Sequence, residues 1–207
     1  MPIVRRRAAI RNDLILERNL TMKKTVFLGD SILLEGYGRV IGDRLADVCT
    51  CWQPPRSGCF TANTLRLNHD CRKQIEGADV IHFNNGLWDA CHLFDDLYPD
   101  GIFTPDEDYV KAVCRLARIL SHMGKTVIFA TTTPVWNHPE IVNEEVISRN
   151  ALVVPELQKM GVVVNDLHSL IWPKYKEYIR EDDHIHLTPA GIEVAAAQVE
   201  AVVRAYL

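Results

Sequence analysis

Residues 25–32 read Thr-Val-Phe-Leu-Gly-Asp-Ser-Ile, and they indicate the architecture expected for the chain. The first four residues form an apolar run of strand length, which is typical of a strand buried on both faces of a parallel sheet. Gly29 then permits a tight turn, and Ser31 stands where a helix could begin. The stretch therefore predicts a strand, a polar turn and a helix in succession.

Similar apolar runs recur along the chain, with segments of helical periodicity between them. The runs lie at 48–52, 80–83, 126–130 and 162–164, the first being the weakest. Helices are expected over 63–75, 104–122, 140–160 and 188–206. A capping box at Thr104 opens the second helix, and Gly124 and Gly161 are expected to end the second and third. The alternation predicts a three-layer α/β/α, flavodoxin-like fold with about five parallel strands.

Composition narrows the classes of function. The 207 residues suit one domain, 47% are hydrophobic, and the net charge of -4 argues against a nucleic-acid or anionic membrane surface. No segment has the length of a membrane span. The six cysteines match no zinc spacing, so we expect mostly reduced, buried thiols in a cytoplasmic protein, with no metal or cofactor.

The first 21 residues differ from the rest of the chain. They carry five arginines and lack the apolar core of a secretory signal. We interpret 1–21 as an N-terminal extension, either outside the native protein, with Met22 as the native start, or disordered. A short docking helix is the alternative. The domain is then expected to span 22–207.

The loops that follow the strands carry the residues of chemical interest, because ligands of parallel sheets bind at the carboxyl ends of the strands. Ser31 follows the first strand and is either a nucleophile or a simple helix cap. Gly58 follows the second and is either a backbone donor or a turn glycine. The third strand leads into the loop 84–89, where amide and indole side chains could donate to an oxyanion.

A pair of residues near the C-terminus completes the set. Asp183 and His186 are three apart before an expected helix, and a carboxylate there could orient an imidazole base. Asp182 as the acid and His184 as the base remain open alternatives. A metal site built from this Asp/His cluster is the weaker interpretation, since no zinc spacing is matched.

Together these residues resemble the SGNH hydrolases, also called GDSL-type esterases, from about residue 24 to residue 201. The matching blocks are Gly29-Asp30-Ser31-Ile32, Gly58, Gly86-Leu87-Trp88-Asp89 and Asp183-His184-Ile185-His186. The resemblance implies that Ser31 is the nucleophile, His186 the base and Asp183 its orienting acid. It also implies an oxyanion hole formed by the backbone of Ser31 and Gly58.

One position departs from the family pattern. Trp88 stands where the family has an asparagine that donates to the oxyanion, so either its indole or a neighbouring amide, Asn84 or Asn85, is expected to serve as the third donor.

The resemblance predicts a serine esterase acting on a small-molecule ester. We expect short acyl groups, above all O-acetyl groups on a carbohydrate, with Trp88 and His92 contacting the substrate from the aromatic loop 88–104. A lysophospholipase or thioesterase, or a non-catalytic carbohydrate-binding relative, are the alternatives. A nucleotide-binding protein is disfavoured because no glycine motif has the required spacing after a strand.

Overall fold

A computed structural model describes residues 22–93 and 101–207, and in this part of the chain five parallel strands form one sheet. The strands are β1 (Lys23–Leu28), β2 (Cys49–Trp52), β3 (Ala78–Phe83), β4 (Gly124–Ala130) and β5 (Val163–Asn165). Their order across the sheet is β2-β1-β3-β4-β5, which is the flavodoxin-like order. The predicted fold class is therefore confirmed, including the weak second strand.

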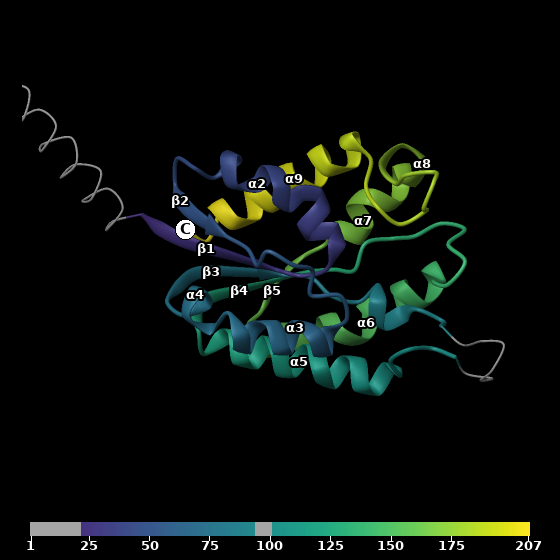
Figure 1. Ribbon diagram of the computed structural model, residues 1–207, viewed down its shortest axis with the longest axis horizontal. Coiled ribbons are helices and arrows are strands. Elements are labelled where there is room, and N and C mark those ends of the chain that lie inside the picture. Colours follow the sequence, from purple (N-terminus) through teal and green to yellow (C-terminus); the bar gives the residue numbers. More distant parts are fainter. Residues whose placement is uncertain (1–21, 94–100) are drawn as a thin grey trace, which may run out of the picture.

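Helices cover both faces of this sheet (Figure 1). One layer holds η1 (Ile32–Tyr37), α2 (Gly38–Arg44), α7 (Leu167–Ile171), η3 (Trp172–Lys174), α8 (Tyr175–Tyr178) and α9 (Pro189–Arg204). The other holds α3 (Thr61–Asp70), α4 (Arg72–Ile75), α5 (Asp106–Ser121) and α6 (Asn143–Lys159). A short helix, η2 (Trp88–Ala90), lies in the loop after β3.

The apolar run of β1 is uninterrupted because successive side chains enter different cores. Phe27 on β1 packs in the core under α2 and α9, whereas Val26 and Leu28 pack in the core under α5 and α6. All three side chains are almost completely buried. Since side chains alternate between the two faces of a strand, only a strand covered on both sides needs apolar residues at every position.

Two of the predicted helix signals behave differently in the structure. The capping box at Thr104 is not formed, because the Thr104 hydroxyl donates to Asp89 Oδ1 (3.1 Å) and α5 begins at Asp106 without a side-chain cap. Gly124 does not end the helix: it is the first residue of β4. Gly161, by contrast, follows α6 with a φ of 78°, as expected of a glycine after a helix.

The remaining helix boundaries agree with the sequence in outline. The segment predicted as one helix over 63–75 is divided at Cys71 into α3 and α4. Pro155 lies inside α6 without ending it. The short helices between β5 and α9 had no clear signal in the sequence.

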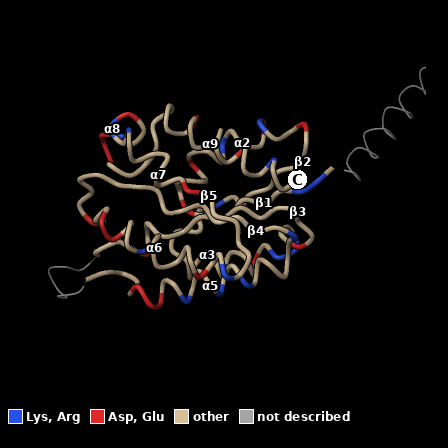
Figure 2. Tube along the Cα trace, turned by 180° about the vertical axis from the view of Figure 1, so that it is seen from behind, with Lys and Arg blue, Asp and Glu red and all other residues tan. Residues whose placement is uncertain are grey.

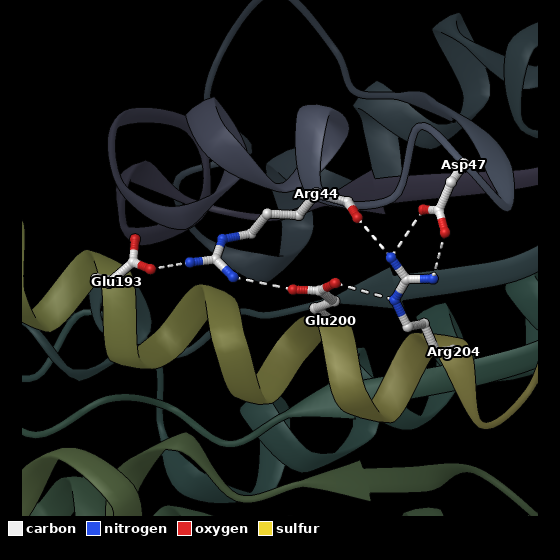
Figure 3. A network of polar contacts seen from close by, with 5 residues as sticks. All are labelled: Arg44, Asp47, Glu193, Glu200 and Arg204. Carbon is white, nitrogen blue, oxygen red and sulfur yellow. Dashed lines mark hydrogen bonds and ion pairs between the residues drawn. The ribbon is translucent and has the colours of Figure 1, made fainter.

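Helices α2 and α9 are joined by a network of ion pairs on the outside of their layer (Figure 3). Glu200 lies 2.9 Å from both Arg44 and Arg204, and Arg204 also pairs with Asp47 at 2.8 Å. Arg44 forms a further ion pair with Glu193. The network connects α2, which continues from η1, to the C-terminal helix α9.

Charged residues are distributed over both helical layers, whereas the centre of the sheet is almost free of them (Figure 2). All six cysteines are free; Cys49 and Cys91 are buried and the other four are partly exposed. No helix in the described ranges is long and apolar enough to cross a membrane. The interpretation of 1–21 concerns residues outside the described part of the chain.

Candidate active site

Three of the predicted residues come together beyond the carboxyl ends of the strands. Ser31 lies in the turn between β1 and η1, and Asp183 and His186 lie in the loop between α8 and α9. The Oγ of Ser31 is 2.8 Å from Nε2 of His186. The Nδ1 of His186 is 3.0 Å from Oδ2 of Asp183. The geometry is that of a hydroxyl, imidazole and carboxylate in hydrogen-bonded series.

The local backbone fixes the carboxylate of Asp183. Its Oδ1 accepts hydrogen bonds from the backbone N–H groups of Ile185 (3.0 Å) and His186 (2.9 Å). Partial burial alone would raise the pKa of Asp183, but these two N–H groups and the imidazole lower it below its ordinary value. An ionised carboxylate only accepts, so Nδ1 of His186 carries the proton and Nε2 accepts from the Ser31 hydroxyl.

The alternative acid and base lie elsewhere. The side chain of Asp182 is 65% exposed, and its Oδ1 accepts from Nε of Arg180 at 2.8 Å. The ring of His184 packs edge-on against Trp136, with ring centroids 4.6 Å apart. Within the described residues neither side chain is hydrogen-bonded to Ser31, so Asp183 and His186 are the pair that the fold presents to the hydroxyl.

The turn that carries Ser31 is held from below by a buried polar pair. Asp30 is completely buried, and its Oδ1 accepts from the Ile32 N–H (3.0 Å) and from Nδ2 of Asn84 (2.8 Å). Burial raises the pKa of Asp30 to about 6. Gly29 permits this approach, because a Cβ there would stand 1.9 Å from Oδ1 of Asn84. Asn84 therefore supports the turn and is not directed at a substrate.

Two of the predicted oxyanion donors already have partners in the protein. The N–H of Gly58 donates to the carbonyl oxygen of Gly29 at 2.6 Å. The Nδ2 of Asn85 donates to the carbonyl oxygen of Cys59 (3.0 Å) and to the hydroxyl of Thr64 (2.9 Å). In this arrangement Gly58 and Asn85 join the loops that follow β1, β2 and β3. Neither residue presents a free donor.

The other two predicted donors are more accessible. The N–H of Ser31 precedes the first helical turn, so it has no intrahelical partner, and no bond to it is formed within the described residues. Trp88 on η2 is 43% exposed. Its place is fixed by Asp89, whose buried carboxylate accepts from the Thr61 N–H (2.9 Å) and hydroxyl (2.8 Å).

His92, which was predicted to contact the substrate, forms contacts within the protein. Its Nε2 lies 2.7 Å from Oε2 of Glu145, and its backbone N–H donates to the carbonyl oxygen of Glu140. His92 thus fastens the loop to the start of α6. Two further aromatic residues of the loop 88–104, Phe94 and Tyr98, lie outside the described residues.

A cavity of about 360 Å³ opens beside Ser31 and His186. Its walls are partly apolar, with Leu187 and Ile192, and partly charged, with Glu35, Arg39 and Arg180. Nε of Arg180 also lies 3.4 Å from Oδ2 of Asp183. This contact was not predicted from the sequence, although the i, i+3 spacing of the two residues is a signal for it. In the described residues no three His, Cys, Asp or Glu side chains are grouped so as to hold a metal ion.

Comparison with solved structures reveals the same fold in several hydrolases. One is an alpha/beta hydrolase enzyme from the metagenome of Lake Arreo, Spain (TM-score 0.74, 18% identity, covering 89% of this chain and 96% of that one). A GDSL-like lipase from Bacteroides thetaiotaomicron has a TM-score of 0.67 and 16% identity, covering 89% of each chain. An acetylxylan esterase from Geobacillus stearothermophilus has a TM-score of 0.69 and 16% identity, covering 86% of this chain and 92% of that one.

The likeness is one of fold. No protein-family model matches the sequence, and no curated protein matches it at a significant level. The expected resemblance to the SGNH hydrolases is confirmed for the fold. The matched part covers nearly the whole length of these structures.

Proposed function

We propose that this protein is a serine esterase with Ser31 as the nucleophile, His186 as the general base and Asp183 as the orienting acid. The observation that carries the proposal is the continuous series of contacts from Ser31 Oγ to His186 Nε2 (2.8 Å) and from His186 Nδ1 to Asp183 Oδ2 (3.0 Å). Hydrogen-bonded contact between nucleophile and base, with a third group orienting the base, is the arrangement that activates a serine.

The chemistry proceeds in two steps. As Ser31 Oγ attacks the ester carbonyl carbon, its proton passes to Nε2 of His186, and the alcohol leaves with that proton. Water then attacks the acyl-enzyme while His186 again accepts a proton, which returns to Ser31 as the acid is released. Throughout, the carboxylate of Asp183 stabilises the charged imidazolium.

The oxyanion is bound first by the backbone N–H of Ser31. We assign the side-chain donor to the indole Nε1–H of Trp88, because Trp88 is exposed and follows β3, the strand adjacent to β1 in the sheet. Gly58 and Asn85, the other predicted donors, would have to exchange Gly29 O and Thr64 Oγ1 for the substrate oxygen. Loss of one such donor typically costs about 10²–10³ in rate.

For the substrate we propose short acyl esters, in particular O-acetyl groups on a carbohydrate. The modest cavity beside Ser31 favours a small acyl group, and one structural neighbour is an acetylxylan esterase. A lipase or thioesterase-type activity is the second candidate, favoured by the GDSL-like lipase neighbour. A series of nitrophenyl esters from acetate to palmitate separates the two, since a lipase would prefer the long chains.

We also propose a cytoplasmic location. The six cysteines are free thiols, and Sγ of Cys49 lies 3.7 Å from Sγ of Cys51 without a bond between them. Thiols this close persist most readily in a reducing compartment.

The decisive experiment compares hydrolysis of nitrophenyl acetate by the unaltered protein and by Ser31→Ala. We expect the variant to lose activity by about 10⁴-fold or more, because the covalent step disappears. Ser148→Ala, on the exposed side of α6, is the matched control and should keep full activity. Equal rates in all three proteins would refute the assignment of the nucleophile.

A further inference from the structure

A second cavity, of about 420 Å³, lies apart from the one beside Ser31. The loop after β4 and the start of α6 supply one wall, with Trp136, His138 and Asn143 among its residues. The segment from η3 to α8 supplies the other, with Trp172, Tyr175 and Lys176. This segment stands at the carboxyl end of the sheet, on the same side as the Ser31 turn (Figure 1).

Aromatic rings form much of this cavity. Trp172 and Tyr175 are stacked, with centroids 4.9 Å apart and planes inclined by 20°. Trp136 packs against Tyr175 at 5.5 Å. Trp172 is nevertheless 38% exposed. Protein packing therefore leaves part of this aromatic surface uncovered where the cavity opens.

Polar groups of both kinds accompany the rings. Asn143 is only 8% exposed, and its Oδ1 accepts from the Val135 N–H, but its Nδ2 has no partner within the described residues. The Nε1–H of Trp136 is likewise buried without an acceptor in the described chain. Glu144 adds an acceptor and Lys176 adds donors at the exposed edge.

The cavity adjoins the loop that carries the proposed acid and base. The N–H of Trp136 donates to the carbonyl oxygen of His184 at 3.3 Å, and their rings are in contact. His138, which lines the cavity, lies within electrostatic range of Asp183 and His186. The cavity therefore borders the loop that carries Asp183 and His186.

The mixture of groups discriminates between classes of ligand. An acyl chain would offer no hydrogen bonds to the polar side chains that line the cavity, Glu144 and Lys176 among them. An anionic ligand would meet Glu144. A neutral sugar has an apolar C–H face, which suits the negative face of an aromatic ring, and hydroxyls that both donate and accept. The volume lies in the range of ligand sites, about 300–1,000 Å³.

We propose that this cavity is a carbohydrate-binding subsite that holds a sugar unit of a neutral oligosaccharide. That this sugar unit is the neighbour of the unit that bears the ester rests on the proposed esterase function. The binding of a sugar in the cavity does not rest on that function. Trp172 supplies the apolar contact, and Glu144 and Lys176 supply hydrogen bonds.

Calorimetric titration of the full-length Ser31→Ala protein with xylotetraose and with cellotetraose tests the subsite without turnover. We expect at least one of them to bind, and we expect Trp172→Ala in the same background to weaken that binding about tenfold. Lys176→Ala, an exposed change on α8 that does not endanger folding, should weaken it by a smaller factor. Tyr206→Ala, an exposed aromatic residue outside the cavity, is the matched control and should bind as before.

The kinetic counterpart uses proteins that retain Ser31. Trp172→Ala should lower the ratio of kcat/KM for acetylated xylo-oligosaccharide to kcat/KM for nitrophenyl acetate, and Tyr206→Ala should not. Failure of both sugars to bind, or equal affinities in the parent, Trp172→Ala and Lys176→Ala proteins, would overturn the subsite. Binding that depends on Trp172, in a protein that does not hydrolyse nitrophenyl acetate, would support the subsite and overturn only the esterase.

Discussion

The carboxylate of Asp183 determines which ring nitrogen of His186 carries the proton. It holds the proton on Nδ1 of His186 and so leaves Nε2 free to accept from Ser31. An amide at this position can donate a hydrogen bond to Nδ1, so that the imidazole proton moves to Nε2. Nε2 then no longer accepts the proton of Ser31. We therefore expect Asp183→Asn to lower kcat for nitrophenyl acetate by roughly 10⁴-fold, with a much smaller change in KM.

Asp182→Asn is the matched control for that experiment. Asp182 is the neighbouring carboxylate, but it is exposed and pairs with Arg180, so the change should leave kcat within about twofold. A comparable loss in both variants would show that the charge of the loop, and not the contact with His186, determines the rate.

Asp30 makes a prediction about stability. The pKa of its carboxyl is raised from 3.8 to about 6 by burial, so between these values the native state binds a proton that the unfolded state has lost. The contribution of Asp30 to the free energy of unfolding therefore falls as the pH rises through this window.

Asp30→Asn removes this titration while keeping an acceptor for Ile32 and Asn84. The free energy of unfolding of the variant, relative to the unaltered protein, should increase by up to about 3 kcal/mol between about pH 4 and about pH 7. Urea unfolding at a series of pH values measures the difference. A difference that stays constant over this range would contradict the prediction.

At the residue scale, the sequence predicted Ser31, Asp183 and His186 because each lies in a short block of recognisable pattern. It did not predict the bond from Gly58 to Gly29 or that from Asn85 to Thr64. These contacts depend on how separate loops pack against each other, and a local pattern carries no information on that.

Among the elements, α9 begins with the most explicit signal in the chain. The hydroxyl of Thr188 accepts from the Gly191 N–H (3.1 Å) and donates to the carbonyl oxygen of Glu177 (2.8 Å). It thus caps α9 and ties it to α8, two residues after His186. Thr188→Ala should lower the free energy of unfolding by about 1–2 kcal/mol in urea titrations.

Thr188→Ser is the control, because it retains the hydroxyl and loses only a methyl group. It should remain within about 0.5 kcal/mol of the unaltered protein. If both variants were equally destabilised, the methyl packing and not the cap would account for the effect.

The elements best predicted from the sequence are the strands that are covered on both faces. The central strands β1, β3 and β4 each end in four buried residues, so their apolar runs were clear, whereas the edge strand β2 is partly exposed and gave the weakest run. The cap at Thr188 was predicted correctly and that at Thr104 was not, although both are Thr-Pro pairs before a helix. The difference is tertiary: Thr104 has Asp89 as a competing acceptor. Short helices such as α7 and α8 span too few residues to establish a periodicity.

On the scale of the whole molecule, the strand order brings distant loops together. β1 lies between β2 and β3, so the loops after all three meet where the chain changes direction across the sheet. The sequence predicted that these loops share an edge. It did not predict the aromatic cavity, because Trp136 and Trp172 come from segments on either side of β5 and only the folded chain unites them.

The contact between Ser31 and His186 joins residues that are 155 positions apart. A ribosome making this chain adds Ser31 well before His186, so a chain terminated between the two residues lacks the imidazole. Hydrolysis by the proposed triad would then report only on chains that extend at least as far as His186. A chain that ends before His186 could contain most of the sheet and still have no activity from the proposed triad.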